Sequence, residues 1–138
     1  MIRTLTIPGE PTAKARPRVV NGHSFTPAKT KNYETLVKEL YWAKHSQEKP
    51  LEGPLCFYLN AYMQIPKSVS KKRRQAMLMG DEVPMKKPDL DNIAKSVTDS
   101  LNGLAYRDDS QIVMLVVSKW WSDAPRVEIS IQEWGVGV

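Results

Sequence analysis

The feature that most narrows the fold of this chain is a strict alternation near its C-terminal end. Polar and apolar residues alternate over residues 126–132, with the apolar positions at Val127, Ile129 and Ile131. Successive side chains of a strand point to opposite faces, so this pattern predicts a half-buried strand with one apolar face. The chain must therefore contain a sheet with helices packed on it.

Three further segments have the composition of strands. Residues 112–117 form a continuous, mostly β-branched run, which predicts a strand that is buried on both faces and forms a hairpin with residues 126–132. Residues 55–63 place apolar side chains on one face, and residues 2–7, which end before a Pro-Gly pair, supply a strand at an edge. The sequence thus predicts four strands.

Two segments have clear helical periodicity and a third has it weakly. Apolar residues at steps of three and four predict one helix over residues 33–44 and another over residues 90–104. A helix over residues 69–79, closed by Gly80, has weaker periodicity. With residues 8–25 as an irregular basic arm, the order of elements predicts a single α/β domain over residues 1–138, with a four-stranded mixed sheet and two to three helices.

Hydropathy excludes two classes of protein. None of the 138 residues falls in an apolar window of the ~18 residues that a membrane-spanning helix needs, and the N-terminus lacks the pattern of a secretory signal. We therefore expect a cytoplasmic protein with no membrane partner. The single cysteine, Cys56, lies in an apolar run and is expected to be a packed thiol.

Charge is unevenly distributed along the chain. Residues 1–31 and residues 67–88 each carry a net charge of +5, whereas residues 89–109 carry −3. Basic segments attract phosphate backbones without regard to sequence, although both segments are also compatible with ordinary solvated surface. The residues expected to contact such a phosphate backbone are Lys14, Arg16, Arg18, Lys71, Lys72, Arg73, Arg74, Lys86 and Lys87. The acidic segment that follows them would repel the same polymer unless a cation lies between the two.

The acidic segment begins at Asp89, where Pro88 favours extended backbone before the helix. Asp89 and Asp91 are predicted to point to the same side, while Leu90 points into the core. A structural role also explains these acids: Asp89 caps the helix, and Asp91 lies near its positive end and pairs with Lys95 at i, i+4.

A second acidic pair, Asp108 and Asp109, favours a functional site. If the chain turns back along the helix, which is ~22 Å long, Asp109 meets Asp89 and Asp91. Clustered carboxylates need a cation, and Mg²⁺ characteristically takes one or two carboxylates with waters and phosphate oxygens; Mn²⁺ is the alternative ion. Such an ion activates water and neutralises charge on phosphate, and Lys95 would contact the scissile phosphate or orient the water.

Other catalytic motifs fit the sequence poorly. An EF-hand loop beginning at Asp89 would need glycine where Ala94 stands. The sequence contains no phosphate-binding glycine loop, and Cys56 with two distant histidines, His23 and His45, makes neither a zinc set nor a nucleophile triad.

Two segments resemble the RusA family of Holliday junction resolvases. The first is Lys-Pro-Asp-Leu-Asp-Asn-Ile-x-Lys over residues 87–95, followed after a helix by Asp-Asp-x-Gln-Ile over residues 108–112. The second is Ile-Pro-Gly-x-Pro-x-Ala-Lys-x-Arg-Pro-Arg over residues 7–18, which is similar to the arm of phage and prophage members. The combination of the two regions is more specific than either motif alone.

The resemblance implies a homodimeric, Mg²⁺-dependent endonuclease, encoded by a bacterium or phage, that nicks branched DNA at four-way junctions symmetrically. It implies that Asp89, Asp91 and Asp109 are metal-binding carboxylates and that Lys95 is the essential lysine. The loop before Asp108 is one residue shorter than in the family's best-known member, so the choice between Asp108 and Asp109 as ligand stays open. The basic stretch 71–74 has no counterpart in the family.

Two other functions are compatible with parts of the sequence. A DNA-binding protein without catalysis would use the basic arm and keep the acids as helix caps. A metal-dependent phosphatase acting on small phosphate esters would have no evident use for two basic segments. Cleavage that depends on Mg²⁺ distinguishes the nuclease from the DNA-binding protein.

Overall fold

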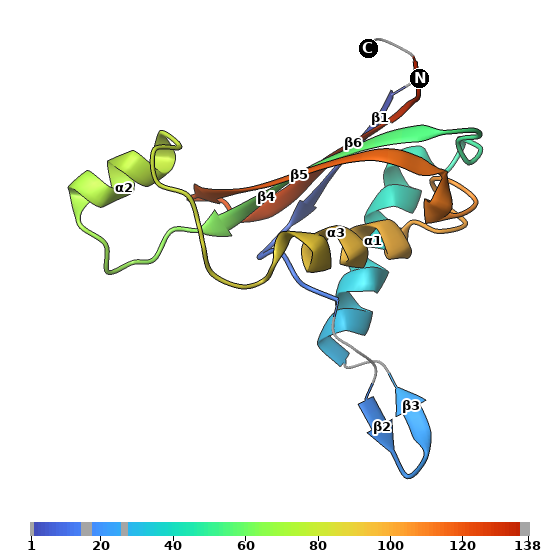
Figure 1. Cartoon of the computed structure of the whole chain (residues 1–138), viewed down its shortest axis with the longest axis horizontal. Helices are drawn as coiled ribbons and strands as arrows, with labels where there is room; N and C mark the ends of the chain where they lie inside the picture. The colour runs from blue at the N-terminus through green and yellow to red at the C-terminus, as the bar shows by residue number, and fades with distance from the viewer. Residues whose placement is uncertain (1, 15–17, 26–27, 136–138) are drawn as a thin grey trace.

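The fold is built on a mixed four-stranded sheet in the order β1-β6-β4-β5 (Figure 1). The computed structural model describes residues 2–14, 18–25 and 28–135. The strands of this sheet are β1 (Ile2–Pro8), β4 (Leu55–Gln64), β5 (Ile112–Ser122) and β6 (Arg126–Glu133). The described residues also form α1 (Ala28–His45), α2 (Lys71–Leu78), α3 (Leu90–Ser100) and a 3₁₀ helix, η1 (Asp109–Gln111). The predicted α/β class, mixed sheet and edge position of the first strand are confirmed.

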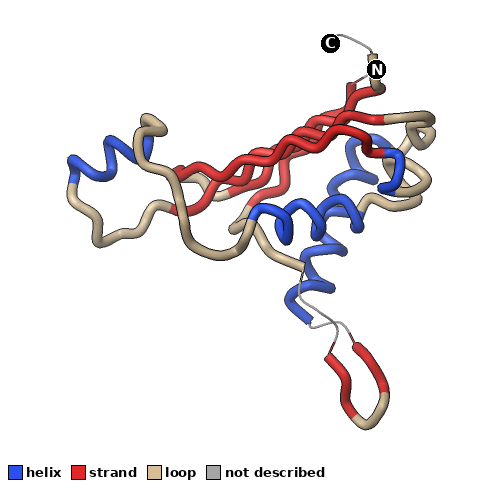
Figure 2. The backbone as a smooth tube through the Cα atoms, viewed as in Figure 1, coloured by secondary structure: helices blue, strands red, loops and turns tan. Residues whose placement is uncertain are grey.

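Helices α1 and α3 pack against each other on one face of the sheet, α1 against β1 and α3 against β5 (Figures 1 and 2). The predicted alternation in β6 is confirmed, because Val127, Ile129 and Ile131 are all buried against these helices. Burying each such aliphatic side chain contributes roughly 1.5–3 kcal/mol. Cys56 is a buried free thiol, as expected. Within the described ranges, none of the helices combines the length and apolar character required to cross a bilayer.

Helices α2 and α3, which lie between β4 and β5 in the sequence, are shorter than predicted. In α2, Ser70 caps the first turn and Gly80, with a φ of 82°, follows its end, which confirms the predicted stop. Helix α3 ends at Ser100, before the predicted end at residue 104, and the apolar residues Ile93, Val97 and Leu101 of its stripe are buried. The prediction that Leu90 points into the core is wrong: Leu90 is the first helical residue, at the end of the stripe, and is 38% exposed.

The predicted hairpin between residues 112–117 and 126–132 is also wrong. β4 lies between these strands, parallel to β5 and antiparallel to β6. β5 is therefore an edge strand and is not buried on both faces, since Val113, Leu115 and Val116 are 47–59% exposed. A continuous apolar run has the same appearance in a central strand and in an edge strand with an apolar surface, so periodicity could not separate the two.

Candidate active site

The acidic residues lie on the crossover that joins the parallel strands β4 and β5. Within it, α3 and β5 pass each other in opposite directions. Lys119, late in β5, donates hydrogen bonds to the carbonyls of Lys86 and Pro88, just before α3 (2.8 and 3.2 Å). Asp109, just before β5, lies beside Asp99 near the end of α3.

Asp89 and Asp91 are exposed at the N-terminal end of α3. Asp89 is the N-cap residue with extended backbone (φ −70°, ψ 152°), at the predicted change from extended chain to helix, but its side chain makes no capping hydrogen bond to the described chain. Lys95 forms its ion pair with Asp99 at 3.3 Å rather than with Asp91. The capping and pairing roles that would explain these acids without a function are therefore not supported.

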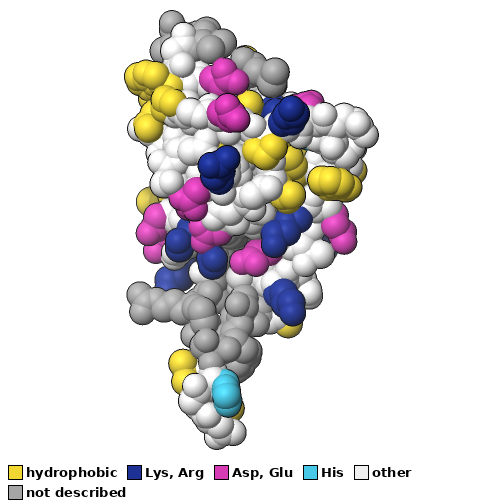
Figure 3. Space-filling view, turned by 90° about the vertical axis from the view of Figure 1, so that its right-hand side faces the viewer, with side chains coloured by type: hydrophobic (Ala, Val, Ile, Leu, Met, Phe, Trp, Pro, Cys, Tyr) yellow, Lys and Arg dark blue, Asp and Glu magenta, His cyan; other side chains and the backbone are white. Residues whose placement is uncertain are grey.

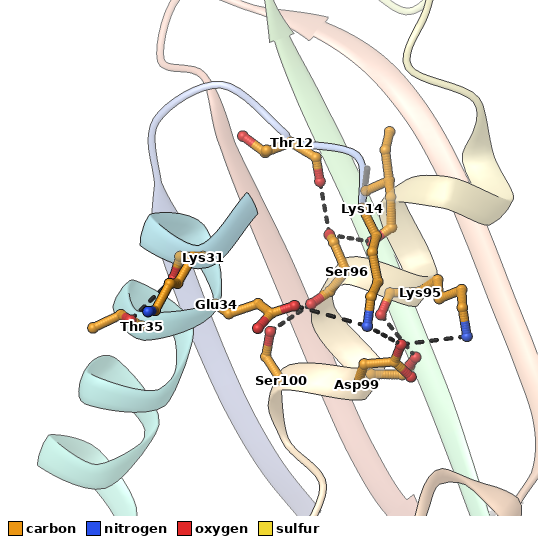
Figure 4. A network of polar contacts seen from close by, with 11 residues as sticks. Thr12, Lys14, Lys31, Glu34, Thr35, Lys95, Ser96, Asp99 and Ser100 are labelled. Carbon is orange, nitrogen blue, oxygen red and sulfur yellow. Dashed lines mark hydrogen bonds and ion pairs between the residues drawn. The ribbon is translucent and has the colours of Figure 1, made fainter. Parts of the chain in front are cut away.

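Asp99 connects several charged groups of the site (Figure 4). Its Oδ2 accepts a hydrogen bond from Nζ of Lys14 at 2.7 Å and forms an ion pair with Nζ of Lys95 at 3.3 Å. Burial opposes ionisation of Asp99, but the hydrogen bonds and charges of the two lysines outweigh it, so the pKa of Asp99 is lowered. An ionised carboxylate is therefore held on this side of α3.

Asp109 experiences the opposite effect. Partial burial, together with the nearby carboxylates of Asp99 and Asp108, raises the pKa of Asp109, and the charge of Lys95 only partly offsets them. Of the two neighbouring carboxylates, Asp99 has the stronger influence on the pKa of Asp109. Two such carboxylates repel each other when both are ionised, and a bound cation relieves this repulsion.

Asp108 has a structural role. Its Oδ2 accepts a hydrogen bond from the backbone N–H of Ser110 at 3.0 Å, and with Gln111 it forms a capping box at the start of η1. The hydrogen bond from Ser110 lowers the pKa of Asp108. Asp108 also lines an open cavity of about 750 Å³ together with Arg107. Of the two neighbouring acids, Asp109 is thus the one that lies beside α3.

The expected meeting of Asp109 with Asp89 and Asp91 is not found. In the ranges that the structure describes, no three His, Cys, Asp or Glu side chains are grouped so that they could hold a metal ion. The relative direction of the elements explains this difference. Because β5 starts beside the end of α3, Asp109 lies next to Asp99, which is roughly 12 Å farther along the helix axis than Asp91.

Two residues of this network, Asp99 and Glu34, were not predicted as site residues. Asp99 follows Asp91 and Lys95 at intervals of four residues, which places the three on one side of α3. This spacing was the signal that could have identified Asp99. Glu34, in α1, lies 3.8 Å from Nζ of Lys14 and has no sequence pattern that links it to the site.

Lys14, Arg16 and Arg18 are the expected DNA-binding residues of the arm. Nζ of Lys14 is held between Asp99 and Glu34. Arg16 lies outside the described residues, and only the backbone of Arg18 is described. The structure therefore shows how the arm begins but leaves its two arginines as predictions.

The prediction of an irregular arm is wrong for its second half. Strands β2 (Arg18–Val20) and β3 (His23–Phe25) form an antiparallel hairpin that projects away from the sheet and helices (Figure 1). Asn21 and Gly22 at its tip have φ values of 51° and 80°, and a two-residue turn of this kind requires positive φ at both positions. The Asn-Gly pair was the sequence signal for this hairpin.

The second basic segment is partly neutralised. Arg73 forms an ion pair with Glu82 at 2.5 Å, and Arg74 forms one with Asp123. The other expected DNA-binding residues of this segment are exposed: Lys71, Lys72, Lys86 and Lys87. Figure 3 shows basic and acidic side chains interspersed on one side of the molecule. The positive charge open to a DNA backbone is therefore smaller than the sequence alone indicates.

Comparison with known proteins agrees with the motifs. The chain matches the family described as Endodeoxyribonuclease RusA over residues 8–132. It is 44% identical over 134 residues to "Uncharacterized protein YqaN" of Bacillus subtilis (strain 168), and the alignment covers 93% of this chain and 94% of that protein. Because the family match spans nearly the whole sequence, the chain belongs to the RusA family of endodeoxyribonucleases.

Proposed function

We propose that this protein is a Mg²⁺-dependent endonuclease that resolves four-way (Holliday) DNA junctions in recombination and repair. Membership of the RusA family supports nuclease chemistry. The observation that carries the proposal is the exposed pair Asp89 and Asp91, which has no hydrogen-bond or ion-pair partner among the described residues and lies on the helix that carries Lys95. Two carboxylates left without protein partners beside a basic surface are available for a ligand.

The donor set fits a hard divalent cation. Mg²⁺ needs only one or two carboxylates and completes its shell with waters and phosphate oxygens, so Asp89 and Asp91 satisfy this requirement. Asp109 lies beside Asp99 and not with Asp89 and Asp91, so it would have to approach them when the cation and DNA bind in order to serve as the predicted third ligand. Asp108 positions Asp109 through the cap of η1. Mn²⁺ would use the same oxygen ligands.

The chain's own residues then bind and orient the DNA strand. A bound ion would activate water and neutralise the charge that develops on the phosphate. The Lys95 side chain is 62% exposed, which leaves its ammonium group able to reach a phosphate oxygen or the attacking water. The exposed lysines of the second basic segment, with the arm, would bind the flanking backbone.

Symmetrical nicking requires two equivalent sites, so the proposal includes a homodimer with a two-fold axis. β5 supports it, because this edge strand exposes the apolar side chains of Val113, Leu115 and Val116. An exposed apolar edge strand is a surface that a second copy of the chain would cover.

A nicking assay on three substrates tests the proposal. We expect cleavage of a four-way junction in Mg²⁺, at paired positions, with much weaker cleavage of a linear duplex of the same sequence and no hydrolysis of a chromogenic phosphate ester. Junction binding without any Mg²⁺-dependent cleavage would contradict the proposal and favour a DNA-binding protein. Hydrolysis of the ester alone would favour a phosphatase.

A further inference from the structure

The part of the arm that precedes the β2–β3 hairpin is fixed along α3 by three hydrogen bonds (Figure 4). The backbone N–H of Lys14 donates to the carbonyl of Asn92 at 3.2 Å. The hydroxyl of Ser96 donates to the carbonyl of Thr12 at 2.7 Å, and Nζ of Lys14 donates to Asp99 at 2.7 Å. The three partners on α3 follow one another by about one helical turn, so the arm runs along the same turns that carry the acidic motif.

The contact with Asp99 differs from the other two because it joins two charged side chains that are both shielded from solvent. The side chain of Lys14 is 29% exposed and that of Asp99 is 15% exposed. Shielding strengthens such a pair relative to a fully exposed one. The same carboxylate oxygen also holds Lys95, and Glu34 of α1 lies on the other side of Lys14. One acid thus fixes a lysine of the arm and the lysine expected to act on the phosphate.

We propose that Asp99 is a positioning residue of the nuclease, which ties the arm to α3 through Lys14 and holds Lys95 in place relative to Asp91 and Asp109. The inference rests on the proposed function and assigns to Asp99 a role that the acidic motif does not include. Helix α3 would then fix both the arm, which binds the DNA backbone, and the groups that act on the phosphate. Small displacements of a substrate relative to catalytic groups are costly, up to about 100-fold for 1 Å.

The alternative is a pair that only stabilises the fold, and the two roles have different consequences. A stabilising pair, when removed, lowers the melting temperature and leaves the rate of the bound complex unchanged. A positioning pair, when removed, lowers that rate even at temperatures where the protein is fully folded. The rate at saturating protein, measured separately from junction affinity, therefore distinguishes them.

The test compares Asp99→Asn, Lys14→Met and their double variant with wild type in single-turnover nicking of a four-way junction. We expect each single variant to nick at least about tenfold more slowly at saturation, and the double variant to be no slower than the slower single one, because both remove the same interaction. Lys14→Arg keeps the charge and is expected to stay within about twofold of wild type. Lys38→Met, which removes an exposed lysine of α1, is the matched control.

Hydrogen exchange gives a readout that needs no activity. The amide of residue 14, which donates to Asn92, is expected to exchange faster in Asp99→Asn and Lys14→Met, while the amides of β6 keep their protection. If Asp99→Asn does not fold, Lys14→Met tests the same pair from the arm.

The outcomes separate the two proposals. If wild type nicks junctions and both single variants nick at the wild-type rate, the positioning role is overturned and the proposed function stands, whether or not the amide of residue 14 is released. If wild type nicks no DNA in Mg²⁺, the proposed function fails and this inference fails with it, although the exchange data still decide whether Asp99 holds the arm.

Discussion

At the scale of single residues, two neighbouring acids of the site, Asp99 and Asp109, have opposite electrostatic surroundings. Asp99 is stabilised in its ionised form by Lys14 and Lys95, whereas Asp109 faces the carboxylates of Asp99 and Asp108. Groups that serve a reaction are often kept at a cost in stability. Asp109 is therefore the residue at which stability and activity should respond in opposite directions.

We expect Asp109→Asn to raise the melting temperature by about 1–2 °C at pH 7 without Mg²⁺, and to abolish nicking. The pKa of Asp109 is raised in the folded state, so the native protein binds this proton more tightly than the unfolded chain. Ionisation thus costs stability as the pH rises through the folded pKa, and the cost is complete above it. Below the ordinary carboxyl pKa the advantage of the variant should disappear.

Thermal melts of wild type and Asp109→Asn between pH 3 and pH 8 check this expectation. Asp81→Asn, which changes an exposed aspartate after α2, is the control. A variant that melts below wild type at pH 7 would show that Asp109 makes a favourable interaction in its ionised form.

Asp89, Asp91, Lys95 and Asp109 are predicted as site residues from the sequence motif, but only part of their arrangement could be predicted. Pro88 biases the residue before it, Lys87, away from helical backbone, and the predicted change from extended chain to helix at Asp89 is confirmed. The neighbour of Asp109 depends on how β5 lies against α3, which no local pattern encodes. Asp99 was visible only as the next residue at a spacing of four.

At the scale of elements, α3 and β5 place the two ends of the site. Periodicity is local, and it predicted where both elements begin but not where they end. The order of the strands depends on contacts distant in sequence, so the apolar run of β5 did not reveal that β4 separates it from β6. That separation makes β5 parallel to β4, and a parallel connection requires the crossover on which the acidic residues lie.

Lys119 links the end of β5 to the segment that enters α3. Because its ammonium group donates to the carbonyls of Lys86 and Pro88, we expect Lys119→Met to loosen the start of the acidic motif and slow nicking by about three- to tenfold. Junction affinity should stay within about twofold, since this lysine is committed to backbone carbonyls. Single-turnover rates and binding isotherms, with Lys38→Met as the control, measure both. An unchanged rate would show that this segment needs no support from β5.

The part of the arm that follows Lys14 is expected to bind the phosphate backbone of DNA. Replacing Arg16 and Arg18 together by Gln should weaken binding to junction and duplex alike, and should reduce the slope of log affinity against log salt by about one unit per lost phosphate contact. Binding titrations at several salt concentrations measure this slope. A slope equal to that of wild type would place the arm away from the DNA.

At the scale of the whole molecule, the proposed reaction needs two copies of the site. If β5 forms the interface, the double variant Leu115→Lys, Val116→Lys should weaken self-association at least about tenfold, because it places charges on an apolar edge. Sedimentation equilibrium measures the association, and the junction assay should then show single nicks in place of paired ones. A variant that remains dimeric and cuts in pairs would exclude β5 as the interface.

Asp91→Asn, compared with wild type for both junction binding and nicking in Mg²⁺, shows whether the carboxylates at the start of α3 carry the chemistry. We expect binding within about twofold of wild type and a nicking rate lower by at least about 100-fold, because the variant keeps the basic surface and loses a cation-binding oxygen. Asp81→Asn should match wild type in both measurements. Nicking by Asp91→Asn at the wild-type rate would contradict the claim that the carboxylates of α3 carry the chemistry.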